Sequence, residues 1–502
     1  MKLFSALQIK ACDAYTITAS GISSLELMER AAAECVSWIT QNFQPSQLFV
    51  TLCGTGNNGG DGLAITRLLH EAGYGVKAFQ IGNIDRMTQD CKANLNRLQQ
   101  LDSSLIQTVP EQSFISDIPP HIIIIDALFG IGLNRPLEGW LVSFVEHVNE
   151  FPNLKIAIDI PSGMPADTVP EPKAAIIHAD FTLSFQFYKR SFLHKETGVF
   201  AGEIKVLDIG LNSHFIEATH THYEMLTTEM AQQLIKPRLS FSHKGTYGHA
   251  LMVGGSKGMM GAICLSALAA MHVGCGKLSL LVPQIGYDIS QILVPEALCQ
   301  TNGQDHIESI TSQNTILAIG IGPGIGKAPQ TALALERFLD QQVLPVVLDA
   351  DALNIIANKP ELLAKIPPNS ILTPHPAEFE RLFGTSTNSM LQAEQARAQS
   401  MLHNINIVLK GHYTIITSPD GLCRYNLSGN AGLATAGSGD VLTGMITGLL
   451  AQGYLPTHAA MLGVHLHGLA ADKALDTESM ESMIARDVIK HIGKAFGELH
   501  LR

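Results

Sequence analysis

The chain has 502 residues, of which 46% are hydrophobic and 16% charged, and its formal net charge at pH 7 is -12. Because single hydrophobic cores rarely extend beyond roughly 250–300 residues, this length predicts two large domains. The negative charge argues against nucleic acid and anionic membrane surfaces as partners, since both require clustered Lys and Arg. The high apolar share excludes a disordered chain, and no uncharged apolar run reaches the roughly 18 residues of a membrane-spanning helix.

The eight cysteines are dispersed and show none of the C-x-x-C spacing of zinc or redox motifs. We interpret them as small buried hydrophobic residues. The first residues, MKLFSALQIKACDAY, contain no long apolar segment of the kind found in signal peptides. We therefore expect a reduced, cytoplasmic protein that acts on small molecules, and we expect it to form a homo-oligomer.

The first glycine-rich segment follows a short β-rich run. Helical spacing over residues 1–45 leads into Leu48–Cys53, then GTGNNGGDG at 54–62 and the amphipathic LAITRLLHEAG. This order predicts a strand, a glycine-rich turn and a helix, as in nucleotide-binding βα units. The two Asn and the Asp of the turn add amide and carboxylate oxygens that suit a hard cation or a ribose. A turn that binds no ligand is the alternative.

Two later strands end in carboxylates. The apolar run at 121–125 is typical of a parallel strand buried on both faces, and Asp126 follows it. The pattern recurs at 155–158, where Asp159 and then Ser162 follow the strand. Carboxyl ends of parallel strands meet at one edge of the sheet, where ligands of α/β proteins bind. Partial burial would suit Asp159 to general-base chemistry, whereas the capping of a turn is the alternative.

Three segments together resemble the NAD(P)H-hydrate epimerase family: GNNGGDG, DALFGIGLNRP and DIPSG. The resemblance covers roughly residues 1–210 and implies a Rossmann-like three-layer αβα domain with acid/base chemistry at Asp159. It also implies a K⁺ ion held by Asn58, Asp126 and Ser162. The residues expected to bind the hydrated cofactor are Asn57, Asn58, Gly59, Gly60, Asp61, Gly130, Ile131, Gly132, Leu133, Asn134, Arg135, Pro136 and Asp159.

The periodicity weakens between about residues 212 and 237, where the polar segment HFIEATHTHYE occurs. We place the domain boundary there, with one domain at 1–225 and the other at 226–502. The three histidines of this segment lack the carboxylate or Cys partners of a metal site, so we interpret them as linker or surface residues.

The second half repeats the alternation of apolar strands and polar turns, which predicts a second α/β domain. Strands are predicted at 250–255, 316–321, 343–348, 371–373 and 405–409, and a helix at 262–273. Polar residues that follow these strands include Asp349, Asp351, His375 and Lys410. A strand-end Lys can pair with a diphosphate, although solvated surface is its commoner place. A His between two prolines is held rigidly, which suits either a substrate contact or a structural role.

The segment NAGLATAGSGDVLTGM at 430–445 gives the strongest indication of function. Small residues and glycines precede an apolar run, which predicts a loop that leads into a helix. The unpaired N–H groups at a helix start bind anions such as phosphate, and Asp440 would lie there. A simple helix cap is the alternative, but capping does not require crowded glycines.

This segment, with KGTYGHALMVGGSKGMMGA, IGPGIG and LTPHPAEFERL, resembles the ADP-dependent NAD(P)H-hydrate dehydratases of the ribokinase-like superfamily. The resemblance covers roughly residues 235–495 and implies a ribokinase-like αβα domain that uses ADP and Mg²⁺. In this family the Asp of the G-x-G-D loop acts as a base, which is Asp440 here. Contacts to the nicotinamide cofactor are expected at Ala262, Gly322, His375 and Asp440, and contacts to the adenine nucleotide at Lys410, Gly411, His412, Tyr413, Thr414 and Gly439.

An epimerase followed by a dehydratase is the order of the bifunctional repair family. It implies that the chain interconverts the R and S forms of the hydrated cofactors NADHX and NADPHX. It also implies that the S form is dehydrated with ADP, giving AMP and phosphate. The alternative is an ATP-dependent small-molecule kinase of the ribokinase-like superfamily with an N-terminal dinucleotide-sensing module.

Overall fold

The computed structural model describes residues 1–133, 135–313 and 315–500. Contacts divide the chain into two compact units. The N-terminal unit consists of Lys2–Thr221 with Asn388–Met390, and the remainder forms the C-terminal unit. The division falls shortly before the expected boundary after residue 225, because β8 (Tyr223–Leu226) pairs with β17 (Cys423–Asn426) in the second sheet.

The N-terminal unit is built on one parallel sheet. Its strands are β1 (Leu48–Cys53), β2 (Gly75–Ile81), β3 (Ile106–Val109), β4 (Ile123–Ala127), β5 (Lys155–Ile158), β6 (Phe181–Phe185) and β7 (Glu203–Leu207). In the described residues these seven strands have the order β3-β2-β1-β4-β5-β6-β7, and every pair is parallel. The order reverses between β1 and β4, which is where sheets of this kind bind ligands.

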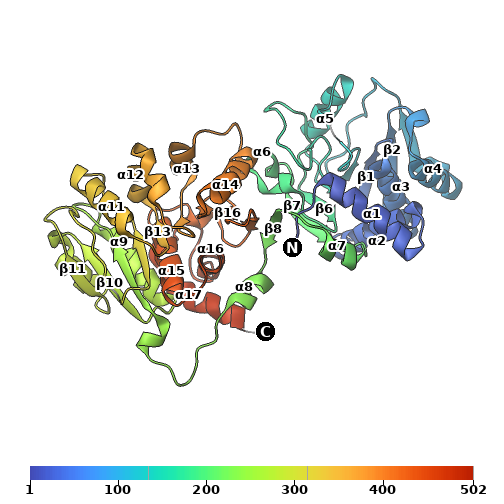
Figure 1. Ribbon diagram of the computed structural model, residues 1–502. Helices are drawn as coiled ribbons and strands as arrows, with labels where there is room; N and C mark the ends of the chain where they lie inside the picture. Colours follow the sequence, from blue (N-terminus) through green and yellow to red (C-terminus); the bar gives the residue numbers. More distant parts are fainter. Residues whose placement is uncertain (134, 314, 501–502) are drawn as a thin grey trace. The chain divides into compact units, whose positions relative to one another are not determined.

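Helices cover both faces of this sheet (Figure 1). They are α1 (Ala6–Ser20), α2 (Ser24–Asn42), α3 (Asn57–Glu71), α4 (Gln89–Leu101), α5 (Trp140–Glu150), α6 (Lys195–Gly198) and α7 (Ser213–Ala218). Right-handed crossovers run in opposite directions from the reversal point, so α3 and α5 lie on opposite faces. Ile125 packs with Ile65 of α3, and Ile124 packs with Phe144 of α5. The apolar strand is therefore buried on both faces, as the sequence predicted.

The C-terminal unit contains a larger mixed sheet. Besides β8 and β17 its strands are β9 (His249–Val253), β10 (Lys277–Val282), β11 (Leu298–Thr301), β12 (Ala318–Ile321), β13 (Val346–Leu348), β14 (Ile371–Leu372), β15 (Asn406–Leu409) and β16 (Thr414–Thr417). In the described part of the chain the order is β11-β10-β9-β12-β13-β14-β15-β16-β17-β8. Only the pairs of β16 with β15 and β17 are antiparallel among these described strands. The order reverses between β9 and β12, and the predicted strands are confirmed with small shifts at their ends.

The helices of this unit are α8 (Thr228–Leu234), α9 (Met260–His272), α10 (Tyr287–Leu293), α11 (Pro329–Gln341), α12 (Ala350–Asn358), α13 (Pro376–Phe383), α14 (Ser389–His403), α15 (Ser438–Ala451), α16 (Pro456–Ala474) and α17 (Ala485–His500). The crossover rule again puts α9 on the face opposite to α11 and α12. α15 packs beside α9 at a glycine, since a Cβ on Gly444 would lie 2.0 Å from the carbonyl oxygen of Ser266. Both units are therefore α/β, as expected.

The glycine-rich segment at 54–62 differs from its prediction. α3 begins at Asn57, so most of the expected turn forms the first turns of the helix. The glycines serve packing there: a Cβ on Gly59 would lie 1.9 Å from the carbonyl oxygen of Gly54. Glycine weakens a helix, but no other residue permits this approach of two backbone segments.

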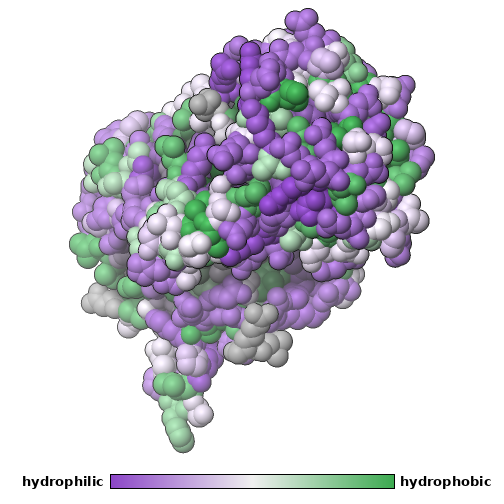
Figure 2. Space-filling view, turned by 90° about the vertical axis from the view of Figure 1, so that its right-hand side faces the viewer, coloured by the Kyte–Doolittle hydropathy of each residue, from purple (hydrophilic) through white to green (hydrophobic). Residues whose placement is uncertain are grey.

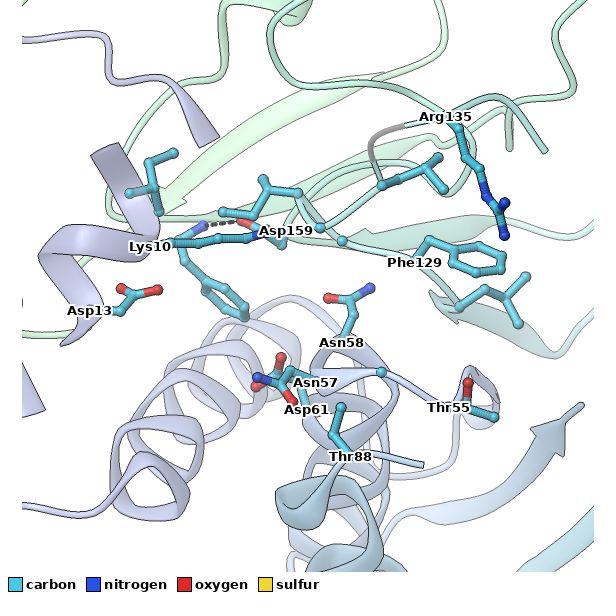
Figure 3. Close-up of a pocket in the computed structure, with 18 of the residues that line it drawn as sticks. Lys10, Asp13, Thr55, Asn57, Asn58, Asp61, Thr88, Phe129, Arg135 and Asp159 are labelled. Carbon is cyan, nitrogen blue, oxygen red and sulfur yellow. Dashed lines mark hydrogen bonds between the residues drawn. The ribbon is translucent and has the colours of Figure 1, made fainter. Parts of the chain in front are cut away.

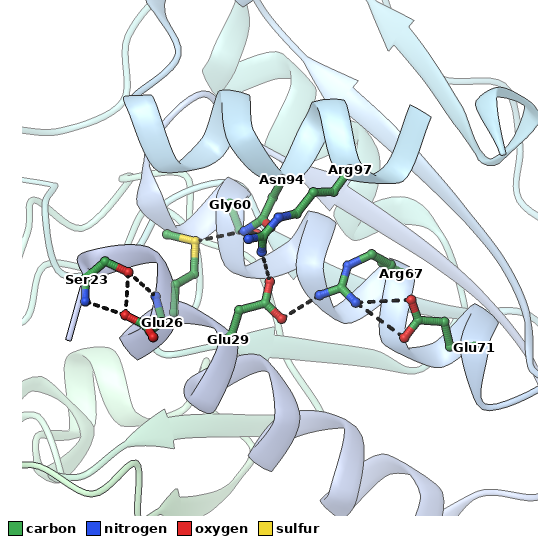
Figure 4. Close-up of polar contacts among 9 residues, drawn as sticks. Ser23, Glu26, Glu29, Gly60, Arg67, Glu71, Asn94 and Arg97 are labelled. Atoms are coloured by element: carbon green, nitrogen blue, oxygen red, sulfur yellow. Dashed lines mark hydrogen bonds and ion pairs between the residues drawn. The ribbon is translucent and has the colours of Figure 1, made fainter. Parts of the chain in front are cut away.

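Polar bonds tie α3 to the two neighbouring helices (Figure 4). The carboxylate of Glu29 in α2 accepts hydrogen bonds from Arg67 of α3 and from Arg97 of α4. Asn94 of α4 donates from Nδ2 to the carbonyl oxygen of Gly60 at 3.2 Å. The bond from Asn94 holds the first turn of α3, whereas the bonds of Glu29 join α2 to the later part of α3 and to α4.

Hydrophobic residues lie scattered among hydrophilic ones on the face of the molecule shown in Figure 2. Among the described residues, no helix combines the length and hydrophobicity needed to cross a bilayer. No disulfide joins any of the eight cysteines, which all lie within the described residues, and only Cys299 is not buried. This burial confirms their interpretation as small hydrophobic residues.

The packing of α3 predicts a contrast between two glycines. Gly59→Ala should lower the free energy of unfolding of the N-terminal unit by about 2 kcal/mol or more, because the new methyl group meets backbone. Gly56→Ala is the control, since a Cβ there meets none of the described atoms within 4 Å. It should change stability by less than about 0.5 kcal/mol. Urea unfolding of the full chain measures both, and equal effects would contradict the packing role.

Candidate active sites

A cavity of about 760 Å³ lies at the carboxyl ends of β1, β4 and β5 (Figure 3). The sequence predicted that these strand ends meet. The lining includes the predicted binding residues Asn57, Asn58, Asp61, Gly130, Ile131, Gly132, Leu133, Arg135, Pro136 and Asp159. Asn134, which was also predicted to bind, lies outside the described residues. The predicted Gly59 and Gly60 pack against Gly54 and Met28, where a Cβ has no room.

Hydrogen bonds of Asp126 join the ends of β4 and β5. Its buried Oδ1 accepts the hydroxyl hydrogen of Ser162 at 2.6 Å, and its Oδ2 accepts the backbone N–H of Ser162 at 2.8 Å. The Oγ of Ser162 accepts the N–H of Phe129 at 2.8 Å. Burial raises the pKa of Asp126 to about 6, although its hydrogen bonds to Ser162 oppose the shift. The turns after β4 and β5 are thereby joined.

The residues predicted to hold K⁺ offer the oxygen donors that hard cations prefer. Asn58 is 7% exposed, and its Nδ2 has no hydrogen-bond partner among the described residues. A flip of this side-chain amide would exchange Nδ2 and Oδ1, so that the oxygen would lie where the nitrogen lies now. The close approach of the next loop depends on Gly130, since a Cβ there would lie 3.2 Å from Asn58 Oδ1. Asn58, Asp126 and Ser162 thus offer amide, carboxylate and hydroxyl oxygens, and the K⁺ site itself stays a prediction.

Asp159 has an unusual backbone conformation directly after β5. Its φ is +67°, and Ile160 donates its N–H to the carbonyl oxygen of Ile158 at 2.8 Å. Asp159 is therefore the central residue of a γ-turn with positive φ, a rare and strained form. Such conformations cluster at functional sites. The side chain lines the cavity and is nearly buried.

Sequence reasoning missed the lysine that neutralises this carboxylate. Nζ of the fully buried Lys189 lies 2.6 Å from Asp159 Oδ1. The same ammonium group donates to Ser184 Oγ at 2.8 Å and to the carbonyl oxygens of Phe185 and Phe187, each at 3.2 Å. The ion pair, rather than a turn cap, is thus the main interaction of Asp159. The partners lie 30 residues apart in the sequence, so no local pattern links them.

Two further carboxyl groups face the cavity. Asp13 of α1 and Asp61 of α3 both line it. Burial raises the pKa of Asp61 well above its usual range and that of Asp13 to about 6, and the charge of Asp159 adds to both shifts. The cavity therefore combines one ion pair with two carboxyl groups whose pKa values are raised. Asp13 was not predicted, because residues 1–45 show only a helical pattern.

The second candidate site lies at the start of α15. Gly437 precedes the helix with φ +91°, and no described side chain caps the first turn. Asp440 lies in that turn, as predicted, but does not cap it. The free N–H groups and the helix dipole favour an anion here. A Cβ on Gly439 would lie 3.2 Å from Nζ of Lys410, so the lysine reaches the helix start.

Asp349 holds this lysine in place. It follows β13 and is 1% exposed. Its Oδ1 accepts a hydrogen bond from Lys410 Nζ at 2.9 Å, and its Oδ2 accepts one from Thr443 Oγ1 at 2.6 Å. Burial alone would lower the pKa of Lys410. The charges of Asp349, Glu378 and Asp440, together with the hydrogen bond to Asp349, outweigh this effect and raise the pKa. A fixed positive charge therefore lies beside the start of α15.

Asp440 is a carboxyl group of this site with a raised pKa. Burial raises its pKa to about 7, the charge of Asp349 adds to the shift, and Lys410 opposes it. A carboxyl group with that pKa can take up and release a proton at neutral pH. Ser266 of α9 donates to the backbone carbonyl of Asp440 at 2.7 Å, which anchors the first turn of α15.

The other residues predicted for this site lie on α9, at the start of α13, directly after β12, and between the end of β15 and the start of β16. His375 caps α13, with Nδ1 accepting the N–H groups of Ala377 at 3.1 Å and Glu378 at 3.3 Å. In the neutral ring Nε2 then carries the proton, and it lies 3.5 Å from Oε1 of Glu378. Gly322 has φ +133°, and a Cβ there would lie 1.9 Å from the carbonyl oxygen of Asp349. Ala262 belongs to α9, Lys410, Gly411, His412 and Tyr413 connect β15 to β16, and Thr414 begins β16.

Comparison with known proteins matches each half of the chain to a protein family. The family described as YjeF-related protein N-terminus matches residues 24–191, and the family described as NAD(P)H-hydrate dehydratase matches residues 250–494. A Moorella thermoacetica protein named bifunctional NAD(P)H-hydrate repair enzyme Nnr is 32% identical over 506 residues, covering 97% of this chain and 95% of that protein. The chain belongs to the bifunctional NAD(P)H-hydrate repair enzyme family.

Two further proteins are similar to the whole chain or to part of it. The Coxiella burnetii protein of the same name is 31% identical over 494 residues and covers 98% of both chains. A crystal structure of the Bacillus subtilis ADP/ATP-dependent NAD(P)H-hydrate dehydratase, co-crystallised with ATP and Mg²⁺, is 34% identical, covers 56% of this chain and 100% of that chain, and has a TM-score of 0.49. Membership confirms the resemblance found in the sequence. It disfavours a kinase with a sensing module.

The buried ion pair predicts a large stability effect. Lys189→Met leaves the charge of Asp159 uncompensated and should cost about 3–5 kcal/mol of unfolding free energy. Lys205→Met removes a lysine from an exposed pair with Glu203 and should cost less than about 1 kcal/mol. Adding Asp159→Asn to Lys189→Met should restore part of the loss. Chemical denaturation of the full chain checks this, and equal costs at Lys189 and Lys205 would contradict the pair's role.

Proposed function

We propose that the chain repairs hydrated nicotinamide cofactors. The N-terminal unit interconverts the R and S epimers of NADHX and NADPHX. The C-terminal unit dehydrates the S epimer with ADP and gives AMP and phosphate. The observation that carries the proposal is Asp440, a carboxyl group with a pKa of about 7 at an uncapped helix start beside Lys410.

In the C-terminal site, Asp440 is the proposed base. It takes the proton of the C6 hydroxyl while that oxygen attacks the terminal phosphoryl group of ADP and releases AMP. The N–H groups at the start of α15, with Gly439 among them, and Lys410 hold the charge of the transferred phosphoryl group. Phosphate then leaves C6, a proton leaves C5, and the C5–C6 double bond returns.

Mg²⁺ fits this site as a companion of the nucleotide. Among the described residues, no group of three or more His, Cys, Asp or Glu side chains is placed to hold a metal by itself. Mg²⁺ commonly uses one or two carboxylates together with substrate phosphates. Asp351 and Glu378, whose charges raise the pKa of Asp440, are the carboxylates available. A bound ion would neutralise phosphate charge.

In the N-terminal site, Asp159 is the proposed acid/base residue for the hydroxyl-bearing carbon. The cavity volume falls within the range of small-molecule sites, roughly 300–1,000 Å³. Asn58, Asp126 and Ser162 are the residues proposed to hold K⁺, which would supply a fixed positive charge. A homo-oligomeric state and a cytoplasmic location stay predictions from the sequence.

Asp440→Asn should reduce ADP-dependent conversion of the S epimer by about 10²–10⁴-fold, because it removes the base. The exposed Asp476→Asn is the control and should retain wild-type activity. Chromatography of NADH and AMP measures the reaction, and titration calorimetry should show that Asp440→Asn still binds ADP. Near wild-type turnover of Asp440→Asn would refute the proposed base.

The pH profile gives a second test. Asp440 acts in its ionised form, so kcat/KM for the S epimer should rise with pH and be half-maximal at about pH 7. At pH 6 it should be roughly a tenth of the plateau. Lys410→Met removes a charge that lowers the pKa of Asp440, so the midpoint should move upward. Initial rates between pH 5.5 and 8.5 test this, and a flat profile in the wild type would contradict it.

A further inference from the structure

We propose that Asp13 is a second catalytic residue of the N-terminal site and donates the proton to the departing C6 hydroxyl, with Asp159 as the base. This inference rests on the epimerase function proposed above. It adds a role for α1, which precedes the part of the chain that the YjeF-related family matches.

The chemistry requires proton transfer on both sides of the nicotinamide ring. When the C6–O bond breaks, the oxygen takes a proton and leaves as water, and the electron pair of the ring nitrogen N1 forms a double bond to C6. Water then adds to the opposite face of C6, loses a proton, and returns the electron pair to N1. An acid or base must lie within hydrogen-bond reach of the oxygen that it serves. One carboxyl group fixed on one side therefore cannot serve both oxygens.

The fold supplies two carboxyl groups from separate elements. Asp159 follows β5 at the edge of the sheet, whereas Asp13 belongs to α1 (Figure 3). Both side chains line the same cavity. Figure 3 shows Asp13 pointing from α1 toward the space that Asn58 and Asp61 border from α3. A ring bound in this cavity can therefore meet a carboxyl group from the helix and another from the sheet.

The two groups differ in their surroundings. Asp159 accepts a hydrogen bond from the ammonium group of the buried Lys189 at 2.6 Å. The carboxyl group of Asp13 forms no hydrogen bond or ion pair within the described part of the chain, and burial raises its pKa to about 6. The charged groups around it are Asp159, Asp61 and Lys189, with Lys10 one turn away on α1. Because Asp159 has a lysine partner and Asp13 has none among the described residues, we assign Asp159 as the base and Asp13 as the acid.

The proton balance closes over one exchange. Asp13 loses a proton to the departing oxygen, and Asp159 gains one from the entering water. Conversion of the opposite epimer runs the steps backward and returns the proton. Solvent can also reset both groups through the cavity opening. No oxidant, reductant or further reactant is needed.

The test uses full-length Asp13→Asn and Asp13→Glu, with the exposed Asp85→Asn as a matched control. Epimer exchange is followed by chiral chromatography from pure R and from pure S hydrate without ADP. Asp13→Asn should slow exchange about 10²-fold or more. Asp13→Glu should recover part of the rate, and Asp85→Asn should match the wild type. Binding of the hydrate by calorimetry and ADP-dependent dehydration of the S epimer should stay unchanged in all three proteins, which verifies folding.

A pH profile distinguishes a proton donor from a structural residue. Because Asp13 acts in its acid form, wild-type exchange should fall as pH rises through about 6. This limb should persist with Glu at the position and disappear with Asn. Wild-type exchange by Asp13→Asn, or an unchanged pH limb in that variant, would overturn the role of Asp13 while leaving the epimerase intact. Absence of catalysed exchange in the wild type would instead overturn the proposed function itself.

Discussion

Both sites depend on a carboxylate that is buried directly after a parallel strand and paired with one lysine. Asp159 follows β5 and pairs with Lys189, and Asp349 follows β13 and pairs with Lys410. An isolated buried charge costs several kcal/mol, so each carboxylate needs its partner. Because parallel strands end at one edge of the sheet, the pair lies where ligands bind. These two buried ion pairs thus lie at the two places where chemistry is proposed.

Each ion pair has a neighbouring carboxyl group whose pKa is raised, Asp13 to about 6 and Asp440 to about 7. Burial is the main cause in both, and the charge of the paired carboxylate adds to it. The surroundings of these two carboxyl groups differ, and this difference suits the two sites to different proposed reactions. The uncapped start of α15 suits a transferred phosphoryl group, whereas the N-terminal cavity is lined by amide side chains and by carboxyl groups suited to proton transfer. The same arrangement, a buried ion pair beside a carboxyl group with a raised pKa, thus serves both proposed reactions. These are a phosphate-driven elimination in one unit and an epimer exchange in the other.

Local features of the sequence predicted much of this arrangement. Apolar runs followed by Asp located β4 and β5, and glycines before an apolar run located the start of α15 with Asp440 in its first turn. Features that depend on contacts distant in sequence were missed. The glycines after β1 were predicted as a turn, because the close approach of Gly59 to Gly54 is visible only in the folded chain. Lys189 lies 30 residues from its partner, and Asp13 lies on a helix whose pattern indicates only packing.

The most direct test of two independent sites in one chain is complementation between two variants. Pure R hydrate is supplied with ADP and Mg²⁺ to Asp159→Asn, to Asp440→Asn, and to an equal mixture of both, and NADH, AMP and phosphate are quantified. Each variant alone should convert the R hydrate no faster than its spontaneous epimerisation permits. The mixture should restore conversion, with one AMP and one phosphate for each NADH. Full conversion by either variant alone, or a mixture no faster than Asp159→Asn alone, would contradict the assignment of the two sites.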